Sequence, residues 1–405
     1  MNFRSVKNTY HKGQAVAANV LYGFPAGRMT IIGVTGTDGK TTTASMIYHI
    51  LSASGKKTAL ISTVAAIIDG AVYDTGFHVT TPSAFSLRRY LKLAKKKGVT
   101  YLVLEVTSHG LDQARVHGIP FAISVITNVT HEHLDYHRTY EAYVLAKTRL
   151  LRASKTALLN RDDSSFPLIE QALKDYRYQG KLLTYGAEDA TFALKNTSFT
   201  LQIPGQFNRY NALAAWAVCQ ELDIAQATIQ EALGTFVLPV GRGEIVYRKD
   251  FSVMIDFAHT PNAIEQILRT IHDEIKPTGR IIHVFGSAGK RDSTKRPLMG
   301  RASSRFADVI ILTAEDPRQE RVENINTEIC DGIPSEILVK RSVTVEEITD
   351  RQNAIDHAIM MAKKGDFVVI TGKGHERSMN LGHSETPWSD HEAVEKAIAK
   401  RGINA

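Results

Sequence analysis

The sequence predicts an α/β protein with two doubly wound parts, a central domain with a mostly parallel sheet and a C-terminal Rossmann-like α/β domain. From residue 29 onward, strand-sized apolar runs alternate with helical stretches, which is the pattern of βαβ units. A chain of 405 residues also exceeds what one hydrophobic core usually organises. Residues 234–243, GTFVLPVGRG, interrupt the pattern with three glycines and a proline, and so predict a linker.

The central domain is expected over residues 29–238. Its predicted helix covers 42–54, and its predicted strands lie in 29–36, 57–63, 101–108, 121–129 and 156–160. Residues 1–28 are too short for a domain, and AVAANVLYGFPAGR reads as a helix followed by a turn. We therefore treat 1–28 as a connector remnant.

The C-terminal domain is expected over residues 239–405, where the same alternation restarts. Helices are predicted over 261–275 and 296–306, and strands within 251–260, 280–289, 307–317 and 365–374. This order predicts a second doubly wound sheet.

Composition narrows the class of protein. Apolar residues make up 43% and charged residues 22%, the balance of a soluble globular protein. The longest apolar runs are strand-sized and the N-terminus lacks a secretory h-region, so we expect a cytoplasmic protein with no membrane partner. The net charge of +7 is spread along the chain, which argues against nucleic-acid binding. Cys219 and Cys330 have no CxxC partner and are expected to be buried thiols.

The strongest local signal is MTIIGVTGTDGKTTTASMIYHIL, a strand, a glycine-rich turn and a helix in the order of a nucleotide phosphate loop. Gly36 and Gly39 can leave backbone N–H groups free to surround phosphate oxygens at a helix N-terminus. Lys40 would neutralise phosphate charge, and the Thr41 hydroxyl would bind Mg²⁺. Val34 replaces the first glycine of the general pattern. The central domain is thus predicted to be a P-loop ATPase domain.

Further motifs follow the phosphate loop, whose form GTDGKTT has the shorter spacing of one ligase superfamily. Each is weak alone, but their order is specific. They are TTPS at 80–83, EVTSHGLDQARV at 105–116, TNVTHEHLDYH at 127–137, GQFNRYNALAA at 205–215, GRGE at 241–244, DFAHTP at 256–261, KRPLMG at 295–300, EDPR at 315–318 and GKGHE at 372–376. Together they resemble the Mur ligase family, in particular its enzymes that add the third residue of the peptidoglycan stem peptide.

The resemblance implies an ADP-forming amide-bond ligase that uses ATP and Mg²⁺. Such an enzyme phosphorylates a carboxylate acceptor, and an amino acid then displaces phosphate from the acyl phosphate. Two anions must meet, and at 4 Å their repulsion is roughly 4 kcal/mol at an effective dielectric near 20, so metal ions and cationic side chains must offset it.

The resemblance also implies the catalytic and metal-binding residues. The implied catalytic residues are Lys40, Glu105, His133 and Lys147, and the implied metal ligands are Thr41, Glu105, His133 and Lys147. Glu105 is expected to end a strand, which is where an α/β sheet presents its ligands. The family's lysine at the place of Lys147 is carbamylated, which turns it into an anionic ligand. A solvated helix lysine is the alternative reading of Lys147. A zinc cluster of His131, His133 and His137 is disfavoured, and a surface role is expected for His131 and His137.

Nucleotide and acceptor contacts are implied in the same way. Asn208 and Asn211 match the adenine-side motif, although Asn211 could equally start a helix. The implied ATP-binding residues are Gly36, Thr37, Asp38, Gly39, Lys40, Thr41, Thr42, Asn208, Asn211, Arg242, Asp256 and His259. The implied acceptor-binding residues are Thr80, Thr81, Thr107, Gln113 and Arg115.

The incoming amino acid is implied to meet Asp316, Arg318, Gly372 and Glu376. In third-residue ligases an Asp-Asn-Pro-Arg motif reads this substrate, and its Arg accompanies diaminopimelate because a guanidinium can bind the distal carboxylate in bidentate fashion. Here the run is Glu315-Asp316-Pro317-Arg318. The carboxylate of Asp316, which only accepts hydrogen bonds, therefore stands where the motif has an asparagine amide, which both donates and accepts them. A turn closing the strand at 308–313 is the alternative reading of EDPR.

Third-residue ligases normally carry an N-terminal domain that grips the uridine nucleotide, and no such domain is expected in these residues. Three readings therefore stay open. The chain is a ligase for a muramyl-peptide-like acceptor and a diaminopimelate-like amino acid, a Mur-like ligase for a folate-like or poly-amino-acid acceptor, or a non-catalytic nucleotide-binding partner subunit. Its partners would be small-molecule substrates, and a monomer is expected.

Overall fold

The computed structural model describes residues 3–73, 81–382 and 384–402. It divides into two compact units: residues 1–130 with 137–237, and residues 131–136 with 238–405. The two units are described separately below. No helix among the described residues is long and apolar enough to cross a membrane.

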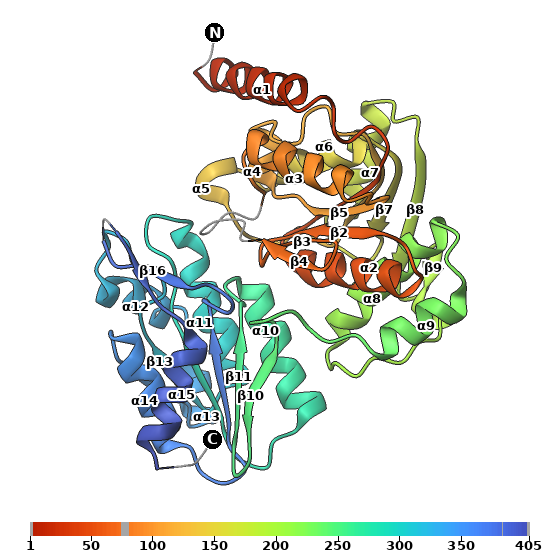
Figure 1. Ribbon diagram of the computed structural model, residues 1–405. Coiled ribbons are helices and arrows are strands. Elements are labelled where there is room, and N and C mark those ends of the chain that lie inside the picture. The colour runs from red at the N-terminus through yellow and green to blue at the C-terminus, as the bar shows by residue number, and fades with distance from the viewer. Residues whose placement is uncertain (1–2, 74–80, 383, 403–405) are drawn as a thin grey trace. The chain divides into compact units, whose positions relative to one another are not determined.

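The first unit is built on a nine-stranded sheet, ordered β4-β3-β2-β5-β1-β6-β7-β8-β9 (Figure 1). Only the β2–β3 and β3–β4 pairs are antiparallel. The strands are β1 (Thr30–Thr35), β2 (Thr58–Ile61), β3 (Ala66–Ile68), β4 (Ala71–Tyr73), β5 (Tyr101–Glu105), β6 (Phe121–Ile126), β7 (Ser154–Asn160), β8 (Lys181–Gly186) and β9 (Phe192–Ala193). The predicted mostly parallel sheet is confirmed.

Helices cover both faces of this sheet, as parallel strands require. One face carries α2 (Lys40–Ala53), α8 (Gln206–Glu221) and α9 (Gln226–Gly234) (Figure 1). The other helices are α3 (Ala84–Lys96), α4 (Ser108–Asp112), α6 (Tyr140–Arg152) and α7 (Phe166–Asp175), with the short η1 (Leu194–Asn196) near the last strand. Side chains of α3 and α6 pack on β1, β5 and β6 in one buried apolar cluster.

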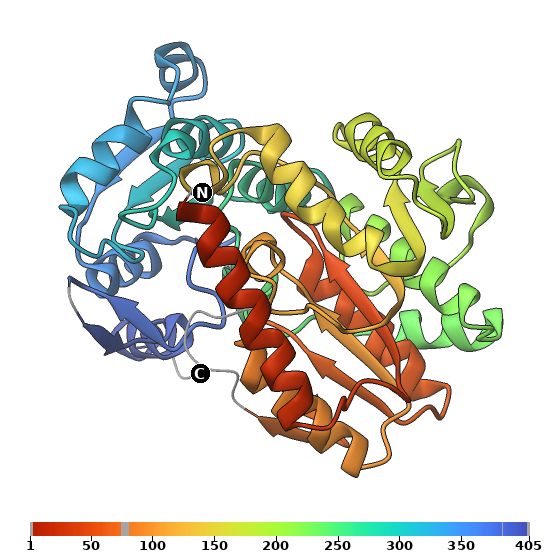
Figure 2. The ribbon, with the colours of Figure 1, turned by 90° about the horizontal axis from the view of Figure 1, so that it is seen from above.

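The connector forms a longer helix than the sequence suggested. Helix α1 spans Phe3–Leu21 and packs on α3 at the outside of the first unit (Figures 1 and 2). Asn19 of α1 accepts a hydrogen bond from Arg88 Nε (2.9 Å) and donates one to the His117 carbonyl (3.3 Å). The connector is therefore part of the first unit.

The second unit has a six-stranded sheet, ordered β10-β11-β15-β12-β13-β14, in which only β10–β11 is antiparallel. This confirms the predicted Rossmann-like C-terminal fold. Its strands are β10 (Glu244–Arg248), β11 (Ser252–Asp256), β12 (Ile281–Phe285), β13 (Val309–Leu312), β14 (Thr344–Glu347) and β15 (Phe367–Thr371), with a small hairpin of β16 (Ser378–Asn380) and β17 (Glu385–Pro387).

Two helical layers flank this second sheet. Helices α14 (Arg351–Met361) and α15 (Asp390–Lys400) share an apolar cluster with the sheet. The remaining helical segments are α5 (Leu134–His137), which crosses the division of the units, α10 (Pro261–Thr270), η2 (Ile271–Ile275), η3 (Ser293–Lys295), α11 (Arg296–Ser304), α12 (Val322–Cys330) and α13 (Ser335–Lys340). The helix expected over 261–275 continues beyond α10 as one π-helical turn.

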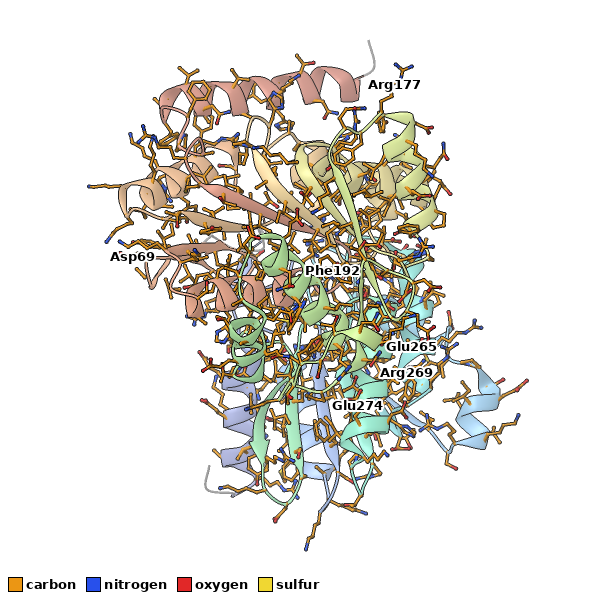
Figure 3. The ribbon with its side chains drawn as sticks, turned by 90° about the vertical axis from the view of Figure 1, so that its right-hand side faces the viewer. Asp69, Arg177, Phe192, Glu265, Arg269 and Glu274 are labelled. Carbon is orange, nitrogen blue, oxygen red and sulfur yellow. The ribbon has the colours of Figure 1, made fainter. Side chains whose placement is uncertain are left out.

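Helix α10 carries an ion pair on its surface. Glu265 and Arg269 on α10 form an ion pair of 2.6 Å, one turn apart (Figure 3). Such exposed pairs contribute little to stability. Both cysteine thiols are free. Cys219 is buried as expected, but Cys330, the last residue of α12, is exposed. The prediction of a buried thiol was therefore wrong for Cys330.

Candidate active site

The phosphate-loop segment lies where β1 ends and α2 begins. Gly39 caps α2 with a left-handed backbone (φ 79°), which leaves the first N–H groups of the helix facing outward. At Gly36 (φ 151°) a Cβ atom would lie 1.8 Å from Thr127 Oγ1, so no side chain fits. The two glycines thus permit a tight loop against the end of β6.

Polar groups after β6 hold this loop in place. Asn128 Oδ1 accepts from the Asp38 N–H (2.9 Å), and Thr127 Oγ1 donates to the Asp38 carbonyl (2.6 Å). Thr37 is fixed by the Thr130 N–H (3.0 Å) and by the Tyr143 hydroxyl (3.2 Å). Sequence reasoning missed Thr127 and Asn128 as loop supports, although both belong to the TNV motif.

The predicted metal-binding pair Thr41 and Glu105 comes together in the first unit. Thr41 Oγ1 lies 3.0 and 3.2 Å from the two Glu105 carboxylate oxygens, and Glu105 ends β5 next to β1, as the sequence indicated. Thr63, which the sequence did not reveal, donates to the same carboxylate from its hydroxyl and its N–H (both 3.0 Å). Glu105 is only 1% exposed.

This cluster is chemically suited to a hard divalent cation. Mg²⁺ takes oxygen ligands, often one or two carboxylates together with substrate phosphates and water. Glu105 and Thr41 supply a carboxylate and a hydroxyl at the phosphate loop. Among the described residues no group of three or more His, Cys, Asp or Glu side chains gathers as a metal site.

Lys40 and Lys147 both face the loop. Lys40 Nζ donates to the Thr37 carbonyl (2.8 Å). Lys147 on α6 is 1% exposed, donates to the Gly36 carbonyl and lies 4.4 Å from the centre of the Tyr143 ring. The alternative reading of Lys147 as a solvated helix lysine was therefore wrong, because α6 packs this face onto the loop.

The three histidines of THEHLDYH do not all belong to the same unit. His131 and His133 belong to the second unit, where Leu134 N–H donates to Asp292 (3.1 Å) and Lys295 Nζ lies 3.2 Å from both Glu132 oxygens. His133 has a left-handed backbone (φ 58°). His137 lies in the first unit, buried against His109 and Tyr143. The surface role expected for His137 was wrong, since these rings enclose it.

The predicted acceptor residues also cluster, except Thr80, which lies outside the described residues. Thr81 Oγ1 accepts from the Thr107 N–H (2.9 Å) and contacts Thr107 Oγ1 (3.1 Å). Arg115 donates to the Thr81 carbonyl and to Gln113 Oε1 (2.6 and 2.9 Å). Arg88, which the sequence did not single out, is buried and donates to the Arg115 and His117 carbonyls; burial lowers its pKa to about 10.

Asn208 and Asn211 lie within α8 and not at its first residue. Asn211 Oδ1 accepts from Thr43 Oγ1 (3.2 Å), and a Cβ atom at Gly39 would lie 2.4 Å from it. Asn208 donates to the Pro204 carbonyl (2.7 Å). The alternative reading of Asn211 as a helix start was wrong, and its side chain packs directly on the phosphate loop.

In the second unit, Arg242, Asp256 and His259 gather around Phe257. The Arg242 guanidinium lies 4.3 Å from the centre of the Phe257 ring, and the His259 ring lies 4.7 Å from it. Asp256 accepts from the Gly243 and Ala258 N–H groups (both 2.6 Å). These bonds fix the backbone on either side of the Arg242–Phe257 contact, and Phe257 was not predicted.

The predicted amino-acid residues meet at the ends of β13 and β15. Lys373 Nζ lies 2.8 Å from Asp316 Oδ1 and 2.5 Å from Glu376 Oε2. Arg318, with a left-handed backbone (φ 51°), donates to the Gly289 carbonyl (2.8 Å). Gly372 faces Glu315, whose Oε2 would lie 3.0 Å from a Cβ atom there.

Two residues around this cluster, Arg291 and Arg351, escaped the sequence reasoning, and Glu315 was noted there only as part of the EDPR run. Glu315 is 7% exposed, and its Oε2 has no hydrogen-bond partner among the described residues. Burial raises the pKa of the Glu315 carboxyl to about 7, against the opposing effect of Lys295. Arg291 has a lowered pKa because of burial and the neighbouring charge of Arg318. Arg351, paired with Asp390 (2.8 Å), donates to the carbonyls of Ala314 (3.1 Å) and Thr371 (2.9 Å) and so holds both strand ends.

Comparison with known families accounts for most of the chain. The sequence model of the Mur ligase middle domain matches residues 34–219, and that of the Mur ligase glutamate ligase domain matches residues 241–374.

Among curated proteins, the chain is similar to UDP-N-acetylmuramoyl-L-alanyl-D-glutamate–2,6-diaminopimelate ligases. It is 37% identical to that of Aquifex aeolicus over 96% of this chain and 82% of the relative. The enzyme of Geobacillus kaustophilus is also 37% identical, over 96% and 83%.

Solved structures give the same grouping. A structure of a UDP-N-acetylmuramoyl-L-alanyl-D-glutamate–2,6-diaminopimelate ligase is 29% identical, covers 98% of this chain and 84% of its own, and has a TM-score of 0.62. A folylpolyglutamate synthase of Mycobacterium tuberculosis has a TM-score of 0.73 over 97% and 95% of the two chains. Its 17% identity shows a shared fold alone.

Proposed function

We propose, because this chain belongs to the Mur ligase family, that it joins diaminopimelate to UDP-N-acetylmuramoyl-L-alanyl-D-glutamate. As a Mur-type ligase it is an ATP-dependent amino-acid ligase of peptidoglycan biosynthesis. The observation that carries the proposal is the phosphate loop with Thr41 3.0 Å from the buried Glu105 carboxylate. The presence of Lys40 and of the buried Lys147 beside the same loop argues against a non-catalytic nucleotide-binding subunit.

The reaction has two steps. First, a carboxylate oxygen of the acceptor attacks the γ-phosphorus of ATP, so that ADP leaves and an acyl phosphate forms. Then the amine of the incoming amino acid attacks the acyl carbon, loses a proton, and the carbon–oxygen bond to phosphate breaks. Lys40 and the N–H groups at the start of α2 stabilise the charge on the transferring phosphoryl group.

Thr41 and Glu105 would hold Mg²⁺, with Lys147 in its carbamylated form and His133 as further ligands. The ion would neutralise the phosphate oxygens, which is what permits two anions to approach each other. Support comes from the hydroxyl and carboxylate of Thr41 and Glu105 at the loop, and from the burial of Lys147 against Gly36. Thr63 orients Glu105 and so takes part indirectly.

The acceptor would lie on the cluster of Thr81, Thr107, Gln113 and Arg115, together with Thr80. Arg115 is the cation of this cluster and Gln113 fixes its orientation (2.9 Å). For ATP we propose contacts from Gly36, Thr37, Asp38, Gly39, Thr42, Asn208, Asn211, Arg242, Asp256 and His259.

Arg318 would bind the distal carboxylate of diaminopimelate, while Gly372, Glu376 and Asp316 frame the same substrate. The neighbouring positive charge of Arg291 supports an anionic group at this place, because two guanidinium groups held close together favour a shared anion. The ammonium of lysine would be repelled there.

The decisive experiment is an ADP-release assay with a matrix of acceptors and amino acids. The acceptors are UDP-N-acetylmuramoyl-L-alanyl-D-glutamate and a pteroate-type folate acid, and the amino acids are diaminopimelate, lysine and glutamate. We expect turnover with the muramyl dipeptide and diaminopimelate. Turnover with the folate acid and glutamate alone would replace the proposal by the folate-like alternative, and a lack of turnover in every combination would favour a non-catalytic subunit.

A further inference from the structure

Lys373 is a cation enclosed by the protein itself. Its side chain is 0% exposed, and its ammonium touches Asp316 Oδ1 (2.8 Å) and Glu376 Oε2 (2.5 Å). Lysine is almost never fully buried unless it is paired. Burial alone lowers the pKa of Lys373, but Glu376 and Asp316 raise it above the ordinary value, so the ammonium keeps its proton.

The two partners of Lys373 are acids of the proposed amino-acid site. Asp316 is held further by the Asn380 N–H (3.0 Å). Lys373 therefore pairs with both negative charges from within the protein. In the sequence it lies three residues from Glu376 and 57 residues from Asp316. An incoming ammonium would have to compete with Lys373 for these oxygens.

Two other cations near this cluster are also paired with acids. Arg351 is paired with Asp390, and Lys295 with Glu132. Glu315 is the third acid close by; because burial raises its pKa to about 7, it carries only part of a negative charge near neutral pH. Arg318 and Arg291 add two positive charges close to each other, and Asp316 is one of the acids that face Arg291 together with Asp135 and Glu132.

We propose that Lys373 determines which amino acid is selected, because by pairing with both Asp316 and Glu376 and offsetting one of their two negative charges it leaves Arg318 to choose a side chain that ends in a carboxylate. This inference rests on the proposed function. It makes Lys373 a positioning and specificity residue that need not touch the substrate. Without its ammonium, the buried Asp316 and the partly buried Glu376 would attract a terminal ammonium and repel a terminal carboxylate.

The test compares Lys373→Met with Lys373→Arg, which keeps the charge. Lys340→Met is the matched control, since Lys340 is 78% exposed on α13 of the same unit. For each protein, kcat/KM is measured for diaminopimelate and for L-lysine at saturating ATP and UDP-N-acetylmuramoyl-L-alanyl-D-glutamate. We expect Lys373→Met to lower the diaminopimelate-to-lysine ratio about 100-fold, Lys373→Arg to restore most of it, and Lys340→Met to leave it unchanged.

A folded Lys373→Met protein with an unchanged ratio, or with equal losses for both amino acids, would overturn the proposal. If that variant does not fold, Glu376→Gln decides: it leaves Lys373 with one fewer anion, so the ratio should rise, and a constant or lower ratio contradicts us. Wild-type protein that ligates neither amino acid refutes the proposed function itself. Ligation of diaminopimelate with an unaffected ratio refutes only the role of Lys373.

Discussion

Thr41 Oγ1 lies 3.0 Å from a carboxylate oxygen of Glu105, a residue 64 positions further along the chain. The two meet because β5 pairs with β1 in parallel and both strands end at the same edge of the sheet. Ligands in open α/β sheets bind at this carboxyl edge. The pair therefore joins the phosphate loop to an acid that can hold a metal ion.

Removal of the Thr63 hydroxyl should weaken metal binding without touching the metal ligands. Thr63→Val breaks a 3.0 Å bond that orients Glu105. We expect a loss in apparent Mg²⁺ affinity of about 10-fold or more, measured by Mg²⁺ titration of ADP release. Thr100→Val, at an exposed threonine of the same unit, serves as control. An unaltered Mg²⁺ requirement in Thr63→Val would show that Glu105 does not depend on Thr63.

Lys40→Ala should abolish ligation while the fold remains. The lost cation sits at the phosphate loop, so kcat should fall by about 10³-fold. ADP release and circular dichroism measure the two parts of this prediction, and Lys96→Ala on the exposed end of α3 is the control. Turnover near that of the wild type would rule out the ligase mechanism.

Lys147 should carry a carbamate in the active protein. Its burial against Gly36 places an anionic side chain beside the loop once the amine has reacted with CO₂. Lys147→Ala should lose activity and recover part of it when short carboxylates are added. Bicarbonate depletion should lower the activity of the wild type in the same assay. Full activity of Lys147→Ala without additive would contradict this role.

Arg318→Ala should reduce kcat/KM for diaminopimelate by about 100-fold or more, because a buried carboxylate would lose its partner. The value for lysine should change little. Arg321→Ala is the control, since Arg321 is largely exposed nearby. A wild-type preference for lysine, or a preference that survives Arg318→Ala, would show that Arg318 does not read the substrate.

Glu315→Gln should stabilise the protein at high pH. Because burial raises the pKa of Glu315 from 4.5 to about 7, the folded state binds the extra proton between these values, and the stability that this proton supplies is lost as pH rises through 7. Glutamine needs no proton, so at pH 8 the variant should gain about 3 kcal/mol in free energy of unfolding, with little gain at pH 4.5. Urea unfolding at both pH values, with Glu336→Gln as exposed control, measures the difference. Equal stabilities at pH 8 would contradict the raised pKa.

The phosphate loop could be predicted from sequence because its signal is local. The glycines, Lys40 and Thr41 lie within six residues, between an apolar strand and a helix that the hydrophobic pattern itself indicates. The same local pattern placed Glu105 at the end of its strand. The alternation of strand-like and helical segments likewise predicted the fold of both units, because such alternation permits few other arrangements.

Other features depended on which residues tertiary packing brings together. Thr63 supports Glu105 only because β2 and β5 are neighbours, and the exposure of Cys330 depends on how α12 packs in the second unit. His137 is buried by the rings of His109 on α4 and Tyr143 on α6, two helices that approach it only in the folded chain. Spacing along the chain does not report such contacts.

The sequence by itself determined the two-domain α/β fold, the phosphate loop and the residue types for phosphoryl transfer, because these follow from local periodicity and from motifs a few residues long. Tertiary structure decided the charge balance of the amino-acid cluster. Asp316, Lys373 and Glu376 could have been three separate surface charges, and the sequence favours none of their possible pairings. Only the packing of the ends of β13 and β15 removes Lys373 and Asp316 from water and brings Glu376 against them, and a charge out of water must find a partner of opposite sign.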